Sequence, residues 1–221
     1  MRVLSGKSES NMSQNEFLST TSLYSSVSVD IGTGDGKRLY RVAQKNPDTL
    51  FIGIDPMKDT MVEISQKANR KPNKGGINNL LLVIASVERL PEELNQMADD
   101  ITVYFPWGSL LECVVKPVEE SMSNIVKIAK DNATFTFITT YSSSYESNEI
   151  DKRQLPEISV SYFEGAYAKL MAKLGLVVEE VIEMTPDDVK AVGTQWAKRL
   201  SSGRSRSYYK ISGHIKKENY P

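Results

Sequence analysis

Short apolar segments alternate with segments of helical periodicity along most of the chain. The apolar segments are bounded by polar or turn-forming residues, which is typical of strands buried inside a sheet. They cover residues 27–31, 50–54, 80–85, 101–105 and 133–139. Helical spacing of apolar residues predicts three helices, which run from Leu39 to near Asn46, from Met57 to Ala68 and from Tyr162 to Leu174. Strands that alternate with helices imply an α/β fold with a mostly parallel sheet covered on both faces.

The last third of the chain departs from this alternation. Residues 176–183 and 207–215 are predicted as two further strands with no clear helix required between them, which favours an antiparallel pair. Residues 140–161 and 186–206 are polar and longer than ordinary connections, so we expect functional loops at the ligand-binding end of the sheet. Residues 1–26 precede the first clear strand as an N-terminal extension, and 221 residues fit a single domain over 1–221.

Composition excludes several classes of protein. Hydrophobic residues make up 40% of the chain and charged residues 25%, which are ordinary globular values. The single Cys113 excludes an intramolecular disulfide, and with one histidine, His214, no metal site is expected. Apolar runs stay well short of the ~20 residues of a membrane span, and the polar start is not a signal peptide. We therefore expect a cytoplasmic protein without a membrane partner.

Charge is unevenly distributed, although the formal net charge is only -1. Residues 64–87 contain four basic residues and no acid, and residues 189–217 contain eight basic residues and no acid. The remainder of the chain then carries 15 basic and 28 acidic residues. This polarisation favours an anionic partner that is approached from one side, over the alternative of an ordinary solvated charged surface.

A glycine-rich turn follows the first predicted strand. Residues 30–36 read Asp-Ile-Gly-Thr-Gly-Asp-Gly, and glycine there permits a tight turn and close approach of the backbone to a ligand. Asp55 follows the second strand, where a carboxylate can accept hydrogen bonds from both ribose hydroxyls. The spacing differs from the G-x-G-x-x-G of dinucleotide sites, and carboxylates at Asp30 and Asp35 would repel a diphosphate. Asp30 instead suits an ammonium group, so the sequence favours S-adenosyl-L-methionine.

Two further strand ends belong to the same predicted crevice, because the carboxyl ends of parallel strands line one edge of the sheet. Small residues and an acid at 85–88 are expected to face the adenine of the cofactor. Trp107 follows the fourth strand within Phe-Pro-Trp-Gly, and it is either a packing anchor or an exposed platform for a planar substrate. The flanking Pro106 and Gly108 favour exposure.

The second tryptophan, Trp196, lies in a basic segment. It is followed by Lys198 and Arg199, and by Arg204 and Arg206 beyond Gly203. Cations that bind phosphates around a ring that stacks on a base are typical of nucleic-acid recognition. The alternative is an amphipathic helical turn whose tryptophan seals the sheet.

Taken together, five segments resemble the aminoglycoside-resistance 16S rRNA (adenine-1408-N1) methyltransferases. The resemblance runs from near residue 1 to Lys217 and is closer to the plasmid-borne enterobacterial member than to the actinomycete enzymes. The glycine turn is generic to methyltransferases, whereas the Pro-Trp and Trp-Ala-Lys-Arg segments are specific. The segments are 30–36, 53–56, 105–108, 139–141 and 196–200.

The resemblance implies a class I S-adenosylmethionine-dependent methyltransferase fold with a Rossmann-like, mostly parallel seven-stranded sheet and a small N-terminal β-hairpin. The two long loops would be target-recognition insertions that act on the 30S ribosomal subunit near helix 44 of 16S rRNA, in a monomeric enzyme. The implied cofactor-binding residues are Asp30, Gly32, Gly34, Arg38, Asp55, Pro56, Ser86, Val87, Glu88, Pro106 and Ser109.

The resemblance also implies the residues that meet the target. Trp107 and Trp196 correspond to residues that clamp a flipped adenine, and Thr194 stands where the family has a short hydroxyl residue. Gln66 replaces a lysine of the similar enzyme, so weaker docking is expected at that patch. The implied RNA-binding residues are Lys67, Arg70, Lys71, Arg153, Arg199, Arg204 and Arg206.

Two other functions remain open at this level. A tRNA guanine-N7 methyltransferase shares a Phe-Pro segment after the fourth strand, but it would leave Trp196 unexplained. A non-catalytic RNA-binding module would bind rRNA without consuming the cofactor. The two basic segments disfavour a small-molecule methyltransferase.

Overall fold

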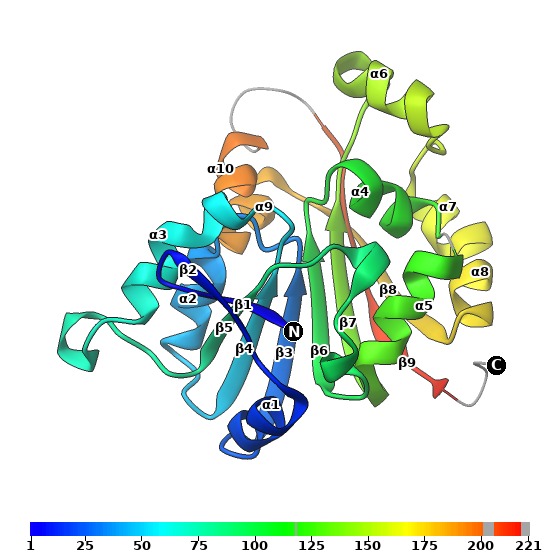
Figure 1. The fold of residues 1–221 in the computed structure, drawn as a ribbon. Coiled ribbons are helices and arrows are strands. Elements are labelled where there is room, and N and C mark those ends of the chain that lie inside the picture. Colours follow the sequence, from blue (N-terminus) through cyan, green and yellow to red (C-terminus); the bar gives the residue numbers. More distant parts are fainter. Residues whose placement is uncertain (118, 201–205, 218–221) are drawn as a thin grey trace. The chain divides into compact units, whose positions relative to one another are not determined.

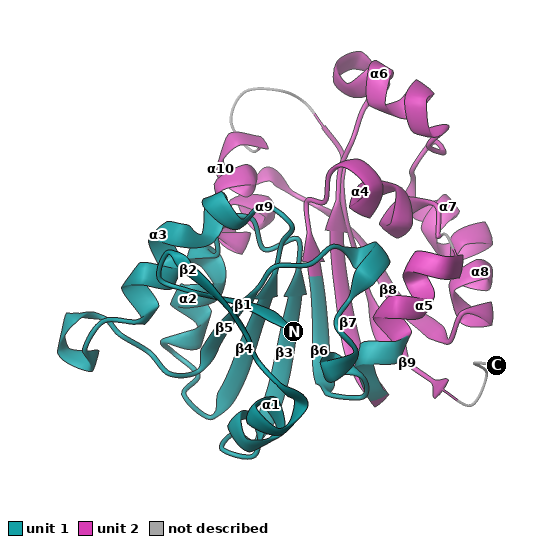
Figure 2. Cartoon of the chain, viewed as in Figure 1, with its two compact units in different colours: residues 1–102, 127–130 teal, residues 103–126, 131–221 magenta. Residues whose placement is uncertain are grey.

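The computed structural model describes residues 1–117, 119–200 and 206–217, and Figure 1 shows its helices and strands. The chain divides into two compact units, drawn in different colours in Figure 2. Unit 1 comprises residues 1–102 and 127–130, and unit 2 comprises residues 103–126 and 131–221. Within the described residues, no helix is both long and apolar enough to cross a membrane.

Unit 1 is built on strands in the order β2-β1-β5-β4-β3-β6. Strands β3, β4, β5 and β6 run parallel, whereas β1 pairs antiparallel with both β2 and β5. The strands are β1 (Arg2–Ser5), β2 (Ser8–Asn11), β3 (Ser26–Ile31), β4 (Thr49–Ile54), β5 (Leu80–Val83) and β6 (Ala98–Tyr104), the last ending in unit 2. The helices are α1 (Gln14–Thr21), α2 (Lys37–Ala43) and α3 (Lys58–Ala68), with short 3₁₀ turns at Pro72–Lys74, Val87–Arg89 and Glu92–Leu94.

The parallel strands of unit 1 form because their residues are apolar on both faces. Val29, Ile52 and Ile101 lie on neighbouring strands and are fully buried. A second buried cluster packs Leu39 and Tyr40 of α2 against Met61 and Ile64 of α3. Burial on both faces is what turns continuous apolar runs into parallel strands rather than helices. The predicted strands at 27–31, 50–54 and 80–85 are confirmed to within about two residues.

Unit 2 centres on three antiparallel strands in the order β7-β9-β8. They are β7 (Ala129–Thr139), whose first two residues belong to unit 1, β8 (Leu176–Met184) and β9 (Tyr208–Ile215). A helical segment from Val160 to Lys173 precedes β8 and contains a π-helical turn at Phe163–Tyr167. The other helices are α4 (Gly108–Val115), α5 (Glu119–Ile128), α6 (Ser143–Arg153), α9 (Pro186–Val192) and α10 (Gln195–Leu200); α7 (Val160–Tyr162) and α8 (Ala168–Lys173) flank the π turn.

The predicted antiparallel pairing of the last two strands is confirmed, but the expected irregular connections are partly wrong. Residues 140–161 contain α6, which begins after Ser142, whose side chain accepts from the Ser144 N–H. Residues 186–206 contain α9 and α10, and Thr185 forms a capping box with Asp188 in front of α9. Side chains that satisfy the free N–H groups of a helix start make short polar helices possible without a strong apolar stripe.

Strand register defines one end of unit 2. Thr139 pairs with Tyr209, and Met184 pairs with Tyr208, so β7 and β8 end where β9 begins. The end of β6 also lies there, because the Phe105 N–H donates to the Ile138 carbonyl at 2.7 Å. In Figure 1, α4, α6, α9 and α10 gather at this end of the strands of unit 2. This is the end from which both long polar segments leave.

Candidate functional site

Asp30 is a buried carboxylate near the carboxyl end of β3. It lies opposite Thr102 of β6, whose hydroxyl donates a 2.6 Å hydrogen bond to Asp30 Oδ1. The Arg38 guanidinium lies 3.8 Å from the same oxygen. Burial raises the pKa of Asp30, although Arg38 and the Thr102 hydrogen bond oppose that shift. A buried carboxylate with one nearby cation suits a ligand that brings a second positive charge.

The glycine turn is fastened to the end of β4 by its own backbone. Gly32 N–H donates to the Ile54 carbonyl at 2.8 Å, and Gly34 N–H donates to Asp55 Oδ2 at 2.9 Å. Asp55 Oδ1 accepts from the Met57 N–H at 2.8 Å, and burial raises the pKa of Asp55. Each carboxylate oxygen has two acceptor sites, so both oxygens keep one for a ligand. Gly32 and Gly34 have φ of 76° and 62°, a backbone conformation that glycine adopts freely.

These residues fit an adenine nucleoside with an attached cation. Asp55 offers acceptors for ribose hydroxyls, and Asp30 offers a charge for an ammonium group. The end of β5 lies beside Asp55, because the Asp55 N–H donates to the carbonyl of Val83, the last residue of β5, at 3.1 Å. Val87 is buried and Glu88 exposed in the 3₁₀ turn that follows β5. Nine of the eleven predicted cofactor-binding residues belong to unit 1, and buried Pro106 and exposed Ser109 belong to unit 2. All eleven assignments stay predictions.

Trp107 is displayed by an unusual turn between β6 and α4. Phe105 has a left-handed backbone with φ of 51°, and Gly108 has φ of 64°. Between them, Trp107 is extended, stands directly before α4 and is 57% exposed. The interpretation of Trp107 as a packing anchor is therefore wrong, because its ring is not buried. More than half of the surface of Trp107 is accessible to solvent, as a stacking platform requires.

Trp196 is displayed by α10 and is 53% exposed. Its neighbour Ala197 is fully buried in a cluster with Phe105, Ile138 and Tyr208. This cluster therefore contacts the turn that carries Trp107 as well as the helix that carries Trp196. The Arg199 guanidinium lies 5.7 Å from the centre of the Trp196 ring, close enough for a cation–π contact.

Thr194 has a structural role in addition to the one the resemblance implies. Its hydroxyl oxygen accepts from the Ala197 N–H at 2.8 Å, which fixes the start of α10. Thr194 precedes Trp196 by two residues, so this bond also orients the tryptophan's helix. The hydroxyl hydrogen can still be donated to another group, because capping uses only a lone pair of the oxygen.

The basic residues predicted for unit 1 lie at and beyond the end of α3. Arg70 and Lys71 are exposed. Lys67 is half-buried, with its Nζ 4.6 Å from the centre of the Tyr40 ring. Asn69 donates to the Ser5 hydroxyl at 3.2 Å, so the end of α3 contacts the N-terminal hairpin. The patch keeps its positive charge in spite of Gln66.

Among the predicted RNA-binding residues of unit 2, Arg153 and Arg206 form ion pairs with glutamates of the same unit. Arg153 pairs with Glu149 and, at 3.1 Å, with Glu112, and only 20% of its side chain is exposed. Arg206 lies 2.6 Å from Glu146 and is 9% exposed. Arg199 is exposed, whereas Arg204 lies outside the described residues. Sequence inspection missed Glu146 as the residue that holds Arg206, as it missed Thr102 beside Asp30.

A cavity of about 790 Å³ opens in unit 2, and residues of α6 form part of its wall. Its walls come from the segment that follows β7, from residues 155–158 and from the start of β9. Arg206 lines it together with Tyr141, Glu157, Glu183 and Tyr209. The Tyr141 hydroxyl donates to the Pro156 carbonyl, and burial raises the pKa of Tyr141 above its ordinary value. Tyr141 therefore links the segment that follows β7 to Pro156 through its hydroxyl group.

Comparison with known proteins agrees with this geometry. The family model of the 16S rRNA (adenine(1408)-N(1))-methyltransferases, called NpmA, matches residues 2–215. An Escherichia coli enzyme of that description is 43% identical over 218 residues, covering 98% of this chain and 100% of the relative. An enzyme of the same description from Streptoalloteichus tenebrarius is 33% identical, covering 93% of this chain and 94% of its own.

A solved structure has the same fold. A point mutant of the 16S rRNA (adenine(1408)-N(1))-methyltransferase from Catenulisporales acidiphilia, crystallised with cosubstrate SAM, superposes with a TM-score of 0.89. It is 29% identical and covers 100% of this chain and 99% of its own. The predicted methyltransferase fold and its N-terminal hairpin are thereby confirmed. This chain belongs to the 16S rRNA (adenine(1408)-N(1))-methyltransferase family.

Proposed function

We propose that this protein transfers a methyl group from S-adenosyl-L-methionine to N1 of adenine 1408 of 16S rRNA in the 30S subunit, and so confers aminoglycoside resistance. The observation that carries the proposal is the pair of half-exposed tryptophans, Trp107 and Trp196, whose neighbours share one buried cluster. Family membership supplies the reaction, and the tryptophans supply a means of holding the base.

S-adenosyl-L-methionine, when bound, supplies the methyl group on a sulfonium centre. Asp55 would accept hydrogen bonds from the ribose, and Asp30 would face the ammonium group. Gly32 and Gly34 would let the backbone approach the ligand, with Arg38, Pro56, Ser86, Val87, Glu88, Pro106 and Ser109 completing the site. Both principal carboxylates have raised pKa values because of burial, so a cationic ligand would favour their ionised forms.

The target base would be held by stacking. Adenine N1 carries a lone pair and no proton, so its methylation needs no general base. The base must leave its stack, which costs a few kcal/mol, and stacking on aromatic rings returns about 1–3 kcal/mol per base. Because methylation makes the adenine cationic, rings on either side of it also stabilise the transition state through cation–π attraction. Trp107, Trp196 and Thr194 are the residues we assign to this step.

The rRNA would be held by the basic residues of both units. Lys67, Arg70 and Lys71 extend from α3, and Arg153, Arg199, Arg204 and Arg206 belong to the two long polar segments. We place the contact near helix 44 of the 30S subunit, with the enzyme acting as a monomer in the cytoplasm. Two basic surfaces suit a large folded RNA, because each phosphate contact adds to a salt-dependent affinity.

The direct test is methyl transfer to purified 30S subunits. Protein, S-adenosyl-L-methionine with a labelled methyl group and 30S subunits should give labelled 16S rRNA, and primer extension should stop at adenine 1408. Binding of 30S without transfer of label would show a non-catalytic RNA-binding module. Label in tRNA and not in 16S rRNA would show the guanine-N7 alternative. Either result would overturn the proposal.

A further inference from the structure

The N-terminal hairpin, β1 and β2, is bound to α3 along one side. Leu4 of β1 is buried with Met61, Ile64 and Ala68 of α3. The Ser65 hydroxyl donates to the Leu4 carbonyl at 2.9 Å in a buried position. The hairpin therefore cannot move independently of α3, because separating them would expose apolar side chains and leave a buried carbonyl unpaired.

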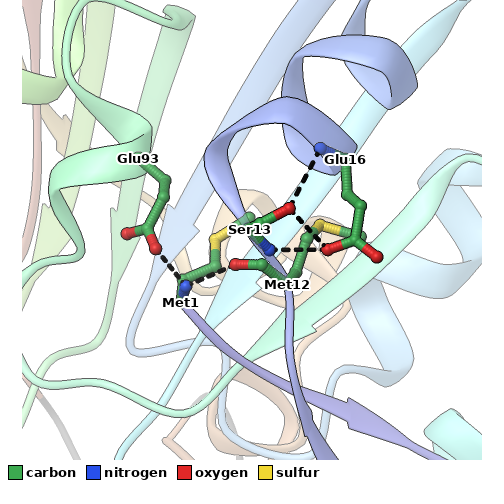
Figure 3. A network of polar contacts seen from close by, with 5 residues as sticks. All are labelled: Met1, Met12, Ser13, Glu16 and Glu93. Atoms are coloured by element: carbon green, nitrogen blue, oxygen red, sulfur yellow. Dashed lines mark hydrogen bonds and ion pairs between the residues drawn. The ribbon is translucent and has the colours of Figure 1, made fainter.

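The base of the hairpin is also fixed, as Figure 3 shows. The Met1 amine pairs with the Glu93 carboxylate and donates to the Met12 carbonyl at 2.7 Å. The chain then enters α1 through a capping box in which Ser13 and Glu16 satisfy each other's backbone N–H groups. Both strands of the hairpin are thus held where they meet the rest of unit 1.

The tip of the hairpin is a two-residue turn, Gly6-Lys7, between the paired residues Ser5 and Ser8. Gly6 has φ of 64°, as tight hairpin turns require at this position. Asn69 at the end of α3 donates to the Ser5 hydroxyl at 3.2 Å. Lys7 is two residues from Ser5, and Arg70 is the neighbour of Asn69, so the Asn69–Ser5 bond brings the backbone of the hairpin tip close to that of the end of α3.

The charge of the tip matches that of the end of α3. Lys7 is exposed, and residues 64–87 contain no acid. Glu9 is the acid of the hairpin, and it is neutralised by Arg2 at 2.6 Å and Lys58 at 2.9 Å. Arg2 and Lys58 hold the Glu9 pKa below its ordinary value. An RNA backbone that approaches Arg70 and Lys71 would therefore meet a further positive charge at Lys7.

We infer that the hairpin tip is part of the rRNA-binding surface, and that Lys7 contacts a phosphate of 16S rRNA beside those bound by Arg70 and Lys71. This inference rests on the proposed function. The hairpin holds Lys7 in position before RNA binds, because its base, its side and its tip each contact other parts of unit 1. Asn69 acts as a positioning residue, since it donates a hydrogen bond to Ser5 and its proposed role requires no contact with RNA.

The test measures 30S binding as a function of salt concentration. Lys7→Ala should weaken binding several-fold at physiological salt and reduce the slope of log affinity against log salt by about one. Lys45→Ala is the matched control, because Lys45 is an exposed lysine of unit 1 that follows α2 rather than α3. It should leave the slope unchanged. Asn69→Ala should shift binding in the same direction as Lys7→Ala, by a smaller factor.

Melting temperature and S-adenosyl-L-methionine affinity should be the same in parent, Lys7→Ala and Lys45→Ala proteins. If the parent binds and methylates 30S and Lys7→Ala leaves the salt slope unchanged, the inference about Lys7 is wrong and the proposed function stands. If Lys45→Ala reduces the slope as much as Lys7→Ala, the effect is one of net charge and the inference is also wrong. A parent that neither binds nor methylates 30S would overturn both.

Discussion

The Arg206 guanidinium lies 2.6 Å from the Glu146 carboxylate and joins the two long polar segments of unit 2. Glu146 belongs to α6 in the first segment, and Arg206 is the last residue of the second. The same guanidinium lies 4.7 Å from the centre of the Tyr145 ring. Arg206 is therefore held in place before any RNA binds, and a phosphate would have to share it with Glu146 or displace Glu146.

Removing either partner of this pair should destabilise unit 2, because a mostly buried charge loses its partner. We expect Arg206→Ala and Glu146→Ala each to lower the free energy of unfolding by about 1–3 kcal/mol. The loss of unfolding free energy in the double variant should be smaller than the sum of the two single losses, by at least about 0.5 kcal/mol. Chemical denaturation of the four proteins measures this coupling. The exposed Lys210–Glu180 pair, 3.2 Å apart, is the control, and we expect a coupling below about 1 kcal/mol there. Strict additivity for Arg206 and Glu146 would contradict the expectation.

Replacement of either tryptophan by alanine should nearly abolish methyl transfer without unfolding the protein. Both rings are more than half exposed, so their removal leaves no cavity in the core. Trp→Phe should keep part of the activity at each position, since phenylalanine retains a flat face. Melting temperature and labelled-methyl transfer are measured together. The buried Phe163 provides the contrast, because Phe163→Ala should lose about 3–5 kcal/mol of stability. Equal losses of stability at Trp107 or Trp196 would exclude the stacking role.

Asp30→Asn should abolish cofactor binding and leave the protein at least as stable as the parent at pH 7. Burial raises the folded pKa of Asp30 above its ordinary value of 3.8, so the native state binds its proton more readily than the unfolded state does. The ionised carboxylate then lowers stability progressively as pH rises through the folded pKa. The advantage of Asp30→Asn should accordingly shrink as the pH falls toward 3.8 and below. Denaturation at about pH 7 and about pH 4 checks this, and an advantage that grows on acidification would refute it.

Asp55→Ala should lose both cofactor affinity and some stability. The expected loss of affinity for S-adenosyl-L-methionine is at least about tenfold, or ~1.4 kcal/mol, by calorimetry. The carboxylate also accepts from the Gly34 and Met57 N–H groups, so the glycine turn loses an anchor worth about 1–3 kcal/mol. Asp48→Ala, at an exposed position, should change neither quantity. Full affinity in Asp55→Ala would remove Asp55 from the cofactor site.

The strands of unit 1 were predictable because a strand that is buried on both faces needs apolar residues at consecutive positions, and such a run is visible in the sequence. The start of β7 was not, because Lys130 and Asp131 are polar. Lys130 is instead held by Asp99 at 2.8 Å, and Asp131 by the Lys217 N–H at 3.0 Å. Most of the short helices of the two polar segments also escaped prediction, because side-chain caps and tertiary packing form them. The visible signals were the Thr185-Pro186 start of α9 and the helical turn considered as an alternative around Trp196, where α10 lies.

The site was predictable where a single residue carries the chemistry, as at Asp30, Asp55 and the two tryptophans. It was not predictable where two residues distant in sequence combine. Nothing near Asp30 in the sequence indicates that Thr102 donates to it, and nothing near Arg206 indicates Glu146. Thr194 shows a third case, since the hydroxyl that the resemblance connects with the target also caps α10.

The left-handed backbone at Phe105 has a consequence for protein engineering. A residue other than glycine at φ of 51° is held there by its surroundings, here by burial of its ring and by its bond to Ile138. The direction of the Trp107 ring is therefore determined by residues 105–108 together with the buried cluster that contains Phe105 and Ile138. Introducing a tryptophan alone into a related methyltransferase would supply the ring but not the backbone conformation that orients it. A transplant of base specificity should move residues 105–108 together with Ile138 as one module.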